Sequence, residues 1–267
     1  MQILYSYIMR PSALVIIIIT LFNIKGKCQT DSLWTMEGIS NITVYLYQKM
    51  ANDSAIGGTA TVINHKNKFF LLTAHHVAKE MTLNSKVFFR IDHDRPAIVD
   101  LSSVTQGNQL NWITHPEADI SLVELKPSNI NIKQRLQQWS LPSALIYAGT
   151  QTLARDNDVT FFGYPILDSD IKHFSALSFS AYLASGLITN YRYDVKTKCT
   201  FFYLDQPSMQ GCSGGGVYAS VKKAEYYSLG KTLLLGVVHG TAGDNTGGKL
   251  CAVTPAYYVW DLLGSIN

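Results

Sequence analysis

Charged residues are scarce in this sequence, and cysteines are fewer still. Charged side chains make up 15% of the 267 residues and hydrophobic side chains 47%, a composition that excludes an intrinsically disordered chain. The four cysteines form no Cys-x-x-Cys pair and no histidine-rich tract accompanies them, which excludes the usual pattern of a structural zinc site. We therefore expect a globular protein that needs no metal and no cofactor.

The N-terminus lacks the run of about 20 apolar residues that a membrane-spanning helix needs. Its apolar stretch, residues 13–22, is shorter, and Arg10 precedes it. This pattern is typical of a secretory signal peptide. We expect residues 1–28 to be such a signal, or else an uncleaved anchor, and we expect the protein to be secreted or periplasmic.

A net charge of one sign is also missing once this segment is removed. Residues 1–28 contain three basic residues and no acidic one, so 19 basic and 19 acidic residues remain. A neutral chain without a basic stripe does not favour binding to nucleic acid or to a membrane surface. We expect neither partner after cleavage, and the sequence makes no prediction about the oligomeric state.

Helical patterns are rare, whereas short β-rich segments recur along the chain. Strands that are separated by turns and not by helices indicate an all-β barrel or sandwich. Residues 126–156 lack strong strand signals, so we expect a linker between two halves there, and residues 255–263 have the pattern of a terminal helix. The expected strands are residues 42–47, 57–63, 69–73, 86–92, 120–125, 159–162, 178–188, 200–204, 216–219 and 233–238.

One serine stands inside a glycine-rich segment, where Gly211, Cys212, Ser213 and Gly214 follow one another. A serine hydroxyl is a weak nucleophile at neutral pH and needs a base within hydrogen-bond reach. Flanking glycines let the backbone turn sharply and leave N–H groups free to face a developing oxyanion. The segment therefore predicts a serine nucleophile.

Two upstream segments offer a base and its partner. His76 follows the apolar strand expected at residues 69–73, and His75 beside it competes for the same role. Asp119 directly precedes the strand expected at residues 120–125, where a carboxylate can fix the tautomer of an imidazole. A lone histidine or aspartate usually has a structural role, so the prediction depends on the three residues together.

The order and spacing of these segments carry a resemblance. Residues 72–77 (Leu-Thr-Ala-His-His-Val), 118–122 (Ala-Asp-Ile-Ser-Leu) and 211–215 (Gly-Cys-Ser-Gly-Gly) place His76, Asp119 and Ser213 in sequence, 43 and 94 residues apart. This pattern resembles the chymotrypsin/trypsin-like serine peptidase family, especially its bacterial HtrA-like branch, and we expect no PDZ domain. The resemblance extends roughly over residues 40–262, since residues 162–165 (Phe-Gly-Tyr-Pro) and 235–238 (Leu-Gly-Val-Val) also match.

The resemblance implies an all-β fold of two six-stranded antiparallel β-barrels of the trypsin-like type with a C-terminal helix. Residues 29–140 would form the first barrel and residues 141–267 the second, with the site in the cleft between them. It also implies a serine endopeptidase that hydrolyses protein or peptide substrates through a Ser213–His76–Asp119 triad and an acyl-enzyme. The N–H groups of Gly211 and Ser213 would form the oxyanion hole.

Cys212 raises a rival nucleophile. The family's turn has glycine two residues before the nucleophile and directly after it, and Ser213 meets this condition whereas Cys212 does not. Cys212 also stands where zymogens of the family carry an acidic residue, so we expect no cleavage-activated switch. The turn would then be held by a disulfide of Cys212 or by its packing as a small apolar side chain. At most one disulfide can form among Cys199, Cys212 and Cys251, and the sequence does not choose the pair.

Substrate preference is less defined. Pro207 stands where trypsin-like enzymes carry an acid, so the resemblance does not support a preference for arginine or lysine. Related enzymes that cleave after glutamate or glutamine use a histidine near this strand, which makes His239 a candidate for substrate recognition, although its register is one residue off. The candidate substrate-binding residues are Pro207, Ser208, Met209, His239, Gly240 and Thr241.

A second hypothesis comes from another class of protein. A pseudoprotease with the same fold would bind partners through the old cleft without catalysis. The complete triad argues against it, because loss of catalysis lets any one member change.

Overall fold

The computed structural model describes residues 35–51, 54–91, 95–105, 109–165, 173–219 and 232–266. Contacts group Trp34–Asn267 into one unit, which contains all the elements discussed below. The expected signal peptide, residues 1–28, lies outside the described residues, and the division into two domains at residue 140 stays a prediction. Within the described ranges, no helix is both long and apolar enough to cross a membrane.

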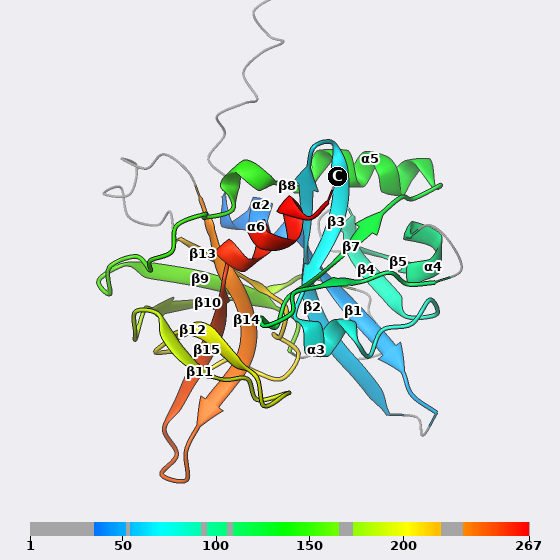
Figure 1. Ribbon diagram of the computed structural model, residues 1–267. Coiled ribbons are helices and arrows are strands. Elements are labelled where there is room, and N and C mark those ends of the chain that lie inside the picture. The colour runs from blue at the N-terminus through cyan, green and yellow to red at the C-terminus, as the bar shows by residue number, and fades with distance from the viewer. Residues whose placement is uncertain are drawn as a thin grey trace, which may run out of the picture. The chain divides into compact units, whose positions relative to one another are not determined.

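The first half of the chain forms a mostly antiparallel sheet (Figure 1). Its strand order is β5-β4-β1-β2-β3-β7-β6, and the short β8 pairs parallel with β2. The strands are β1 (Thr43–Lys49), β2 (Ala55–His65), β3 (Lys68–Thr73), β4 (Lys86–Ile91), β5 (Arg95–Asp100), β6 (Ile113–Thr114), β7 (Ser121–Leu125) and β8 (Leu141–Pro142). The strands expected at residues 57–63 and 69–73 form a hairpin, because β2 and β3 pair up to His65 and Lys68.

The second half forms a seven-stranded antiparallel sheet in the order β10-β9-β13-β14-β15-β12-β11. Its strands are β9 (Asp158–Gly163), β10 (Leu177–Tyr182), β11 (Ile188–Tyr191), β12 (Lys198–Leu204), β13 (Gly216–Ala219), β14 (Leu234–Gly243) and β15 (Lys249–Pro255). The sheet curls, because an isolated bridge joins Leu183, just after β10, to Leu204 of β12.

The all-β class, the two antiparallel sheets and the terminal helix are thus confirmed. The two six-stranded barrels are not reproduced in detail, since in the described part of the chain neither strand order closes through a paired strand, and in the second sheet an isolated Leu183–Leu204 bridge connects the two sides. The expected strand at residues 178–188 covers β10 and reaches only the first residue of β11. The strands β5 and β15 and the two-residue β6 and β8 were not expected. Alternation in Lys249–Pro255 is weak, because five consecutive residues at its end are buried.

The helices are short, and two of them, α5 (Ile130–Gln138) and α6 (Tyr257–Gly264), contribute buried side chains to the core. In α5, which lies in the expected linker, the Asn129 side chain caps the first turn by accepting the N–H of Asn131 at 2.9 Å. The helix buries Ile132 and Leu136 in the core of the first sheet. The other helices are α2 (Met36–Ile42), α3 (His75–Ala78) and α4 (Leu101–Val104).

The C-terminal helix α6 ties the two halves together. It follows β15 of the second sheet, and its Trp260 Nε1 donates to the carbonyl oxygen of Ile146, which bridges to Leu234 of β14, at 3.1 Å. The Trp260 ring packs edge-on against His65 of β2 in the first sheet, with centroids 6.0 Å apart. A core cluster that includes Phe70, Phe162 and the C-terminal Leu263 contains buried residues of both sheets. The residues between the two sheets therefore pack against side chains from both halves of the chain.

Candidate active site

His76 and Asp119 meet because two strands end side by side. Thr73, the last residue of β3, pairs with Ser121, the first residue of β7. His76 in α3 then lies next to Asp119, two residues before β7. The His76 Nδ1 lies 2.7 Å from Asp119 Oδ2, and the His76 main-chain N–H donates to Asp119 Oδ1 at 2.9 Å. The pair has the arrangement of a base and the carboxylate that orients it.

Asp119 is a buried carboxylate with several donors. Its exposed fraction is 0%, and burial alone would raise its pKa. Hydrogen bonds from His239 and His76 outweigh burial and hold the pKa of Asp119 well below its ordinary value. The side chain is therefore an ionised acceptor at neutral pH.

The competing histidine, His75, points elsewhere. Its Nδ1 lies 3.2 Å from Ser121 Oγ and 3.3 Å from Thr114 Oγ1, and these two hydroxyls are 2.9 Å apart. Burial lowers the pKa of His75, which favours its neutral form. His75 thus belongs to a polar cluster at the β6–β7 edge, and the carboxylate of Asp119 pairs with His76.

A third histidine shapes the loop that carries Asp119. The His115 Nδ1 accepts the main-chain N–H groups of Glu117 at 3.1 Å and Ala118 at 2.9 Å. A nitrogen that accepts two N–H groups carries no proton, so the proton of neutral His115 lies on Nε2, 3.5 Å from Asp261 of α6. His115 therefore supplies a hydrogen-bond acceptor for the main-chain N–H groups of Glu117 and Ala118 in the loop before Asp119.

Ser213 lies in a turn whose glycines are sterically required. Gly211 has φ +96° and Gly214 has φ +87°, both in the left-handed region that favours glycine. A Cβ on Gly214 would overlap the Thr59 carbonyl oxygen and lie 3.0 Å from the Ala74 main-chain nitrogen. The turn is therefore pressed against the end of β3, directly before α3 and His76.

Thr59 of β2 holds this turn from the opposite sheet. Its N–H donates to the Ser213 carbonyl oxygen at 2.8 Å, and its hydroxyl donates to the Gly211 carbonyl oxygen at 2.7 Å. The same hydroxyl accepts the Tyr164 N–H at 3.1 Å. Thr59 is 0% exposed, so these contacts are shielded from water. Sequence reasoning looked for a device that holds the turn near Cys212 and missed Thr59.

Two N–H groups of the turn have no acceptor among the residues that the structure describes. Cys212 N donates to Met209 O at 3.0 Å, and Gly214 N donates to Val238 O at 2.8 Å. The intervening N–H of Ser213, and that of Gly211, have no hydrogen-bond partner among the described residues. Free N–H groups that converge in a tight turn form a site for a negatively charged oxygen.

The Ser213 hydroxyl donates to the carbonyl oxygen of His239 at 3.2 Å. Within the described part of the chain, no hydrogen bond joins it to the His76 ring. The two side chains nevertheless share a neighbour, because the His76 and His239 rings meet edge-on with centroids 5.6 Å apart. In structures without substrate, catalytic hydrogen bonds are often long or poorly aligned and form fully only when substrate binds.

Cys212 is buried and forms no disulfide, and the same is true of Cys199 and Cys251. The disulfide considered for Cys212 is absent, and its alternative role as a small apolar side chain fits the packing. A Cβ added to Gly163 would lie 2.7 Å from the Cys212 sulfur. Burial raises the pKa of the Cys212 thiol, which disfavours the nucleophilic thiolate.

His239 and Arg192 are the partners of Asp119 that sequence reasoning missed. His239 Nδ1 lies 2.5 Å from Asp119 Oδ2, and Arg192 Nη2 donates to Oδ1 at 3.3 Å. Arg192 lies between β11 and β12, where it also pairs with Asp194 at 2.6 Å. No local signal identifies Arg192, because only the tertiary fold brings this hairpin to the loop before β7.

The other candidate substrate-binding residues lie beside the glycine turn that carries Ser213. Thr241 Oγ1 donates to the Ser208 carbonyl oxygen at 2.6 Å and lies 2.9 Å from Ser208 Oγ. Met209 is 45% exposed, Pro207 is half-buried, and a Cβ on Gly240 would meet nothing within 4 Å. His239 departs from this group, since it is 3% exposed and turns toward Asp119.

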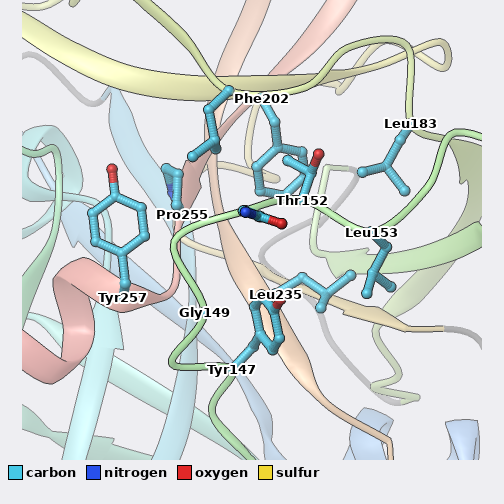
Figure 2. A pocket seen from close by; sticks show the side chains of 11 residues that line it. Tyr147, Gly149, Thr152, Leu153, Leu183, Phe202, Leu235, Pro255 and Tyr257 are labelled. Atoms are coloured by element: carbon cyan, nitrogen blue, oxygen red, sulfur yellow. The ribbon is translucent and has the colours of Figure 1, made fainter.

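Figure 2 shows a separate, largely apolar pocket of the second sheet. Its lining includes Tyr147, Leu153, Leu183, Phe202 and Tyr257. None of the predicted site residues lines it.

His76, Asp119 and His239 place three potential metal-ligand atoms within 4.8 Å of one another. The residues do not fit a cation well. Asp119 is fully buried, and the Arg192 guanidinium already supplies a positive charge at 3.3 Å from its carboxylate. The two ring nitrogens face the carboxylate itself, which is the arrangement of N–H donors around a shared acceptor.

The fold is that of trypsin-like proteases of the HtrA type. The chain is similar to the active form of the Rv3671c protease from M. tuberculosis, with a TM-score of 0.57, 17% sequence identity, and coverage of 86% of this chain and 83% of the other. The MamO protease domain from Magnetospirillum magneticum gives a TM-score of 0.56 at 13% identity, covering 84% and 96%. The HtrA-type protease AlgW, determined with a tripeptide, gives 0.52 at 15% identity, covering 86% and 61%.

No protein-family model matches the sequence. The curated proteins give no significant match either. At 13–17% identity the structural likeness establishes the fold, and the function must be argued from the site.

Proposed function

We propose that this protein is a serine endopeptidase in which Ser213, His76 and Asp119 form the catalytic triad. The observation that supports this most strongly is the His76 contact with Asp119 Oδ2, at 2.7 Å, beside a glycine turn that carries Ser213. The carboxylate accepts a hydrogen bond from the Nδ1–H group, which leaves Nε2 of His76 unprotonated and ready to act as a base.

In the proposed reaction, the Ser213 hydroxyl leaves the His239 carbonyl oxygen and turns to His76 Nε2. Ser213 Oγ then attacks the carbonyl carbon of the peptide bond while its proton passes to Nε2. The tetrahedral intermediate collapses as the C–N bond breaks and Nε2 returns the proton to the leaving amine. Water repeats the sequence on the acyl-enzyme and releases the acid, with Asp119 stabilising the imidazolium at each stage.

The free N–H groups of Gly211 and Ser213 would bind the oxyanion. Each such donor contributes about 3–4 kcal/mol to the transition state in serine proteases. The Thr59 hydroxyl, bonded to the Gly211 carbonyl oxygen at 2.7 Å, would keep this turn in the binding-competent form without a zymogen switch.

Substrates would be peptides whose side chain is bound beside Ser208, Met209, Gly240 and Thr241. These residues carry no charge, so the proposal includes no preference for arginine or lysine. The predicted signal segment, residues 1–28, leads us to propose that the enzyme acts outside the cytoplasm.

Peptide cleavage tests this function. Folded wild-type protein should hydrolyse members of a broad peptide library, as detected by mass spectrometry, and the Ser213→Ala variant should not. Binding of peptides by both proteins, without cleavage by either, would contradict the proposal and favour the pseudoprotease.

A further inference from the structure

The carboxylate of Asp119 serves two imidazoles. His239 Nδ1 lies 2.5 Å from Oδ2, the same oxygen that His76 Nδ1 contacts at 2.7 Å. The residue comes from β14 of the second sheet, whereas His76 and Asp119 come from the first half of the chain. The contact therefore joins the two halves at the site.

An irregularity in β14 aims this side chain. The register between β14 and β15 shifts between Val238, which pairs with Val253, and Gly240, which pairs with Ala252. His239 is the extra residue of this bulge. Bulges turn a side chain out of the regular alternation, and they are frequent next to active sites.

Hydrogen bonds fix the protonation state of the His239 ring. A carboxylate can only accept, so Nδ1 must carry the proton that faces Asp119. The opposite nitrogen, Nε2, accepts the main-chain N–H of Tyr193 at 3.3 Å, so it carries none. The two contacts together select the neutral Nδ1–H tautomer.

Aromatic side chains hold the ring in this orientation. Tyr193 stacks on it with centroids 5.0 Å apart and an interplanar angle of 25°, and Phe201 lies 5.1 Å away at 36°. His239 is 3% exposed. With both nitrogens engaged and the ring enclosed, no polar atom of its side chain remains to bind a substrate.

We propose that His239 is a positioning residue, which donates its Nδ1 proton to Asp119 and thereby holds the carboxylate in the orientation that keeps His76 a base. This inference rests on the proposed function and replaces the substrate-recognition role expected from the sequence. The main-chain carbonyl of His239 also accepts the Ser213 hydroxyl at 3.2 Å. One residue thus contacts both ends of the triad.

The Nδ1–H group of His239 also withdraws negative charge from Asp119 Oδ2, the oxygen that stabilises the imidazolium of His76. Without the His239 donor, Oδ2 would stabilise that imidazolium more strongly, and the acid limb of the pH–rate profile would move to higher pH. Among the described residues, the other titratable or charged groups that face this carboxylate or its partners are Arg192, Tyr193 and Asp194 between β11 and β12, Cys199 of β12, and His75 of α3. All of them stay in place in the variants below.

Two substitutions separate the hydrogen bond that His239 donates to Asp119 from the packing of its ring. In His239→Asn the amide nitrogen can reach the place of Nδ1 and donate, whereas His239→Leu has no donor. Both lose the acceptor for Tyr193. We expect His239→Leu to react with a fluorophosphonate probe about 100-fold more slowly than wild type, as a misplaced catalytic group does, with the acid limb shifted upward. His239→Asn should stay within about tenfold of wild type, because the hydrogen bond is restored.

The matched control is His65→Leu, which removes a histidine from the far end of β2 and should leave the reaction rate unchanged. Equal rates and identical pH profiles for wild type and His239→Leu would overturn the inference alone, and so would a His239→Asn variant as slow as His239→Leu. Folded wild type that does not react overturns the proposed function, and the inference with it.

A spectroscopic measurement covers the case in which His239→Leu does not fold. The Ser213→Ala protein should show two low-field imidazole N–H proton resonances in its NMR spectrum, one from each ring bound to Asp119. Detection of a single resonance, assigned to His76, would overturn the inference.

Discussion

Replacing Asp119 by asparagine tests the chemistry of the site with a change of one atom. The new amide nitrogen needs an acceptor, whereas both oxygens of Asp119 now face donors. Oδ1 faces the His76 main-chain N–H at 2.9 Å and Arg192 at 3.3 Å, neither of which can lose its proton. The amide nitrogen must therefore take the place of Oδ2, opposite the two imidazoles.

The imidazoles can adapt only by changing tautomer. His76 would move its proton to Nε2, where it faces Ser213 and can no longer act as a base. We expect the reaction rate to fall about 10⁴-fold, the loss measured for the same change in a related triad, which corresponds to about 5.4 kcal/mol. If His239 moved its proton to Nε2 as well, this N–H group would face the Tyr193 N–H donor, so we also expect a loss of stability.

The stability loss should be about 3 kcal/mol, the lower end of the range for a broken buried ion pair, because Arg192 keeps Asp194 as a partner at 2.6 Å. Fluorophosphonate labelling rates and urea unfolding measure the two effects, and Asp156→Asn, at an exposed position, is the control. A labelling rate for Asp119→Asn within about tenfold of wild type would refute the assignment of Asp119.

Further predictions concern the turn and the loop. Gly214→Ala should lower the melting temperature and abolish labelling because its Cβ would overlap Thr59, whereas Gly264→Ala, with open space around it, should change stability by less than about 0.5 kcal/mol; equal melting temperatures would contradict this. Thr59→Val should slow labelling and reduce the free energy of unfolding by about 1–3 kcal/mol, since the Gly211 carbonyl loses a buried donor; unchanged urea curves would count against it. Burial lowers the pKa of His115, so the unfolded chain takes up its proton first as the pH falls, and stability should decline below about pH 6.5; urea midpoints that rise on acidification would disprove the argument.

The sequence carried enough information to place the candidate base, its carboxylate and the serine. The glycines around Ser213 reflect local steric demands, and β3–β7 pairing joins two apolar strands, one ending at Thr73 shortly before His76 and the other beginning at Ser121 shortly after Asp119. Both signals are local or depend on strand order, so they can be read without coordinates.

The supporting contacts are different in kind. Thr59, Arg192 and the ring of His239 act across segments 73 to 152 residues away in the chain, as their hydrogen bonds to Asp119 and Gly211 show. Nothing in their immediate neighbours predicts those partners. The family resemblance led us to expect His239 at the substrate. The β14 bulge explains why its side chain lies against Asp119 instead, since one extra residue redirects it.

Mapping the site of a fluorophosphonate adduct tests the central claim most directly. Wild-type protein should gain one adduct, located by tandem mass spectrometry on Ser213, and Ser213→Ala protein with an unchanged melting temperature should gain none. An unmodified wild-type protein that is folded, or an adduct that persists in Ser213→Ala, would contradict the account.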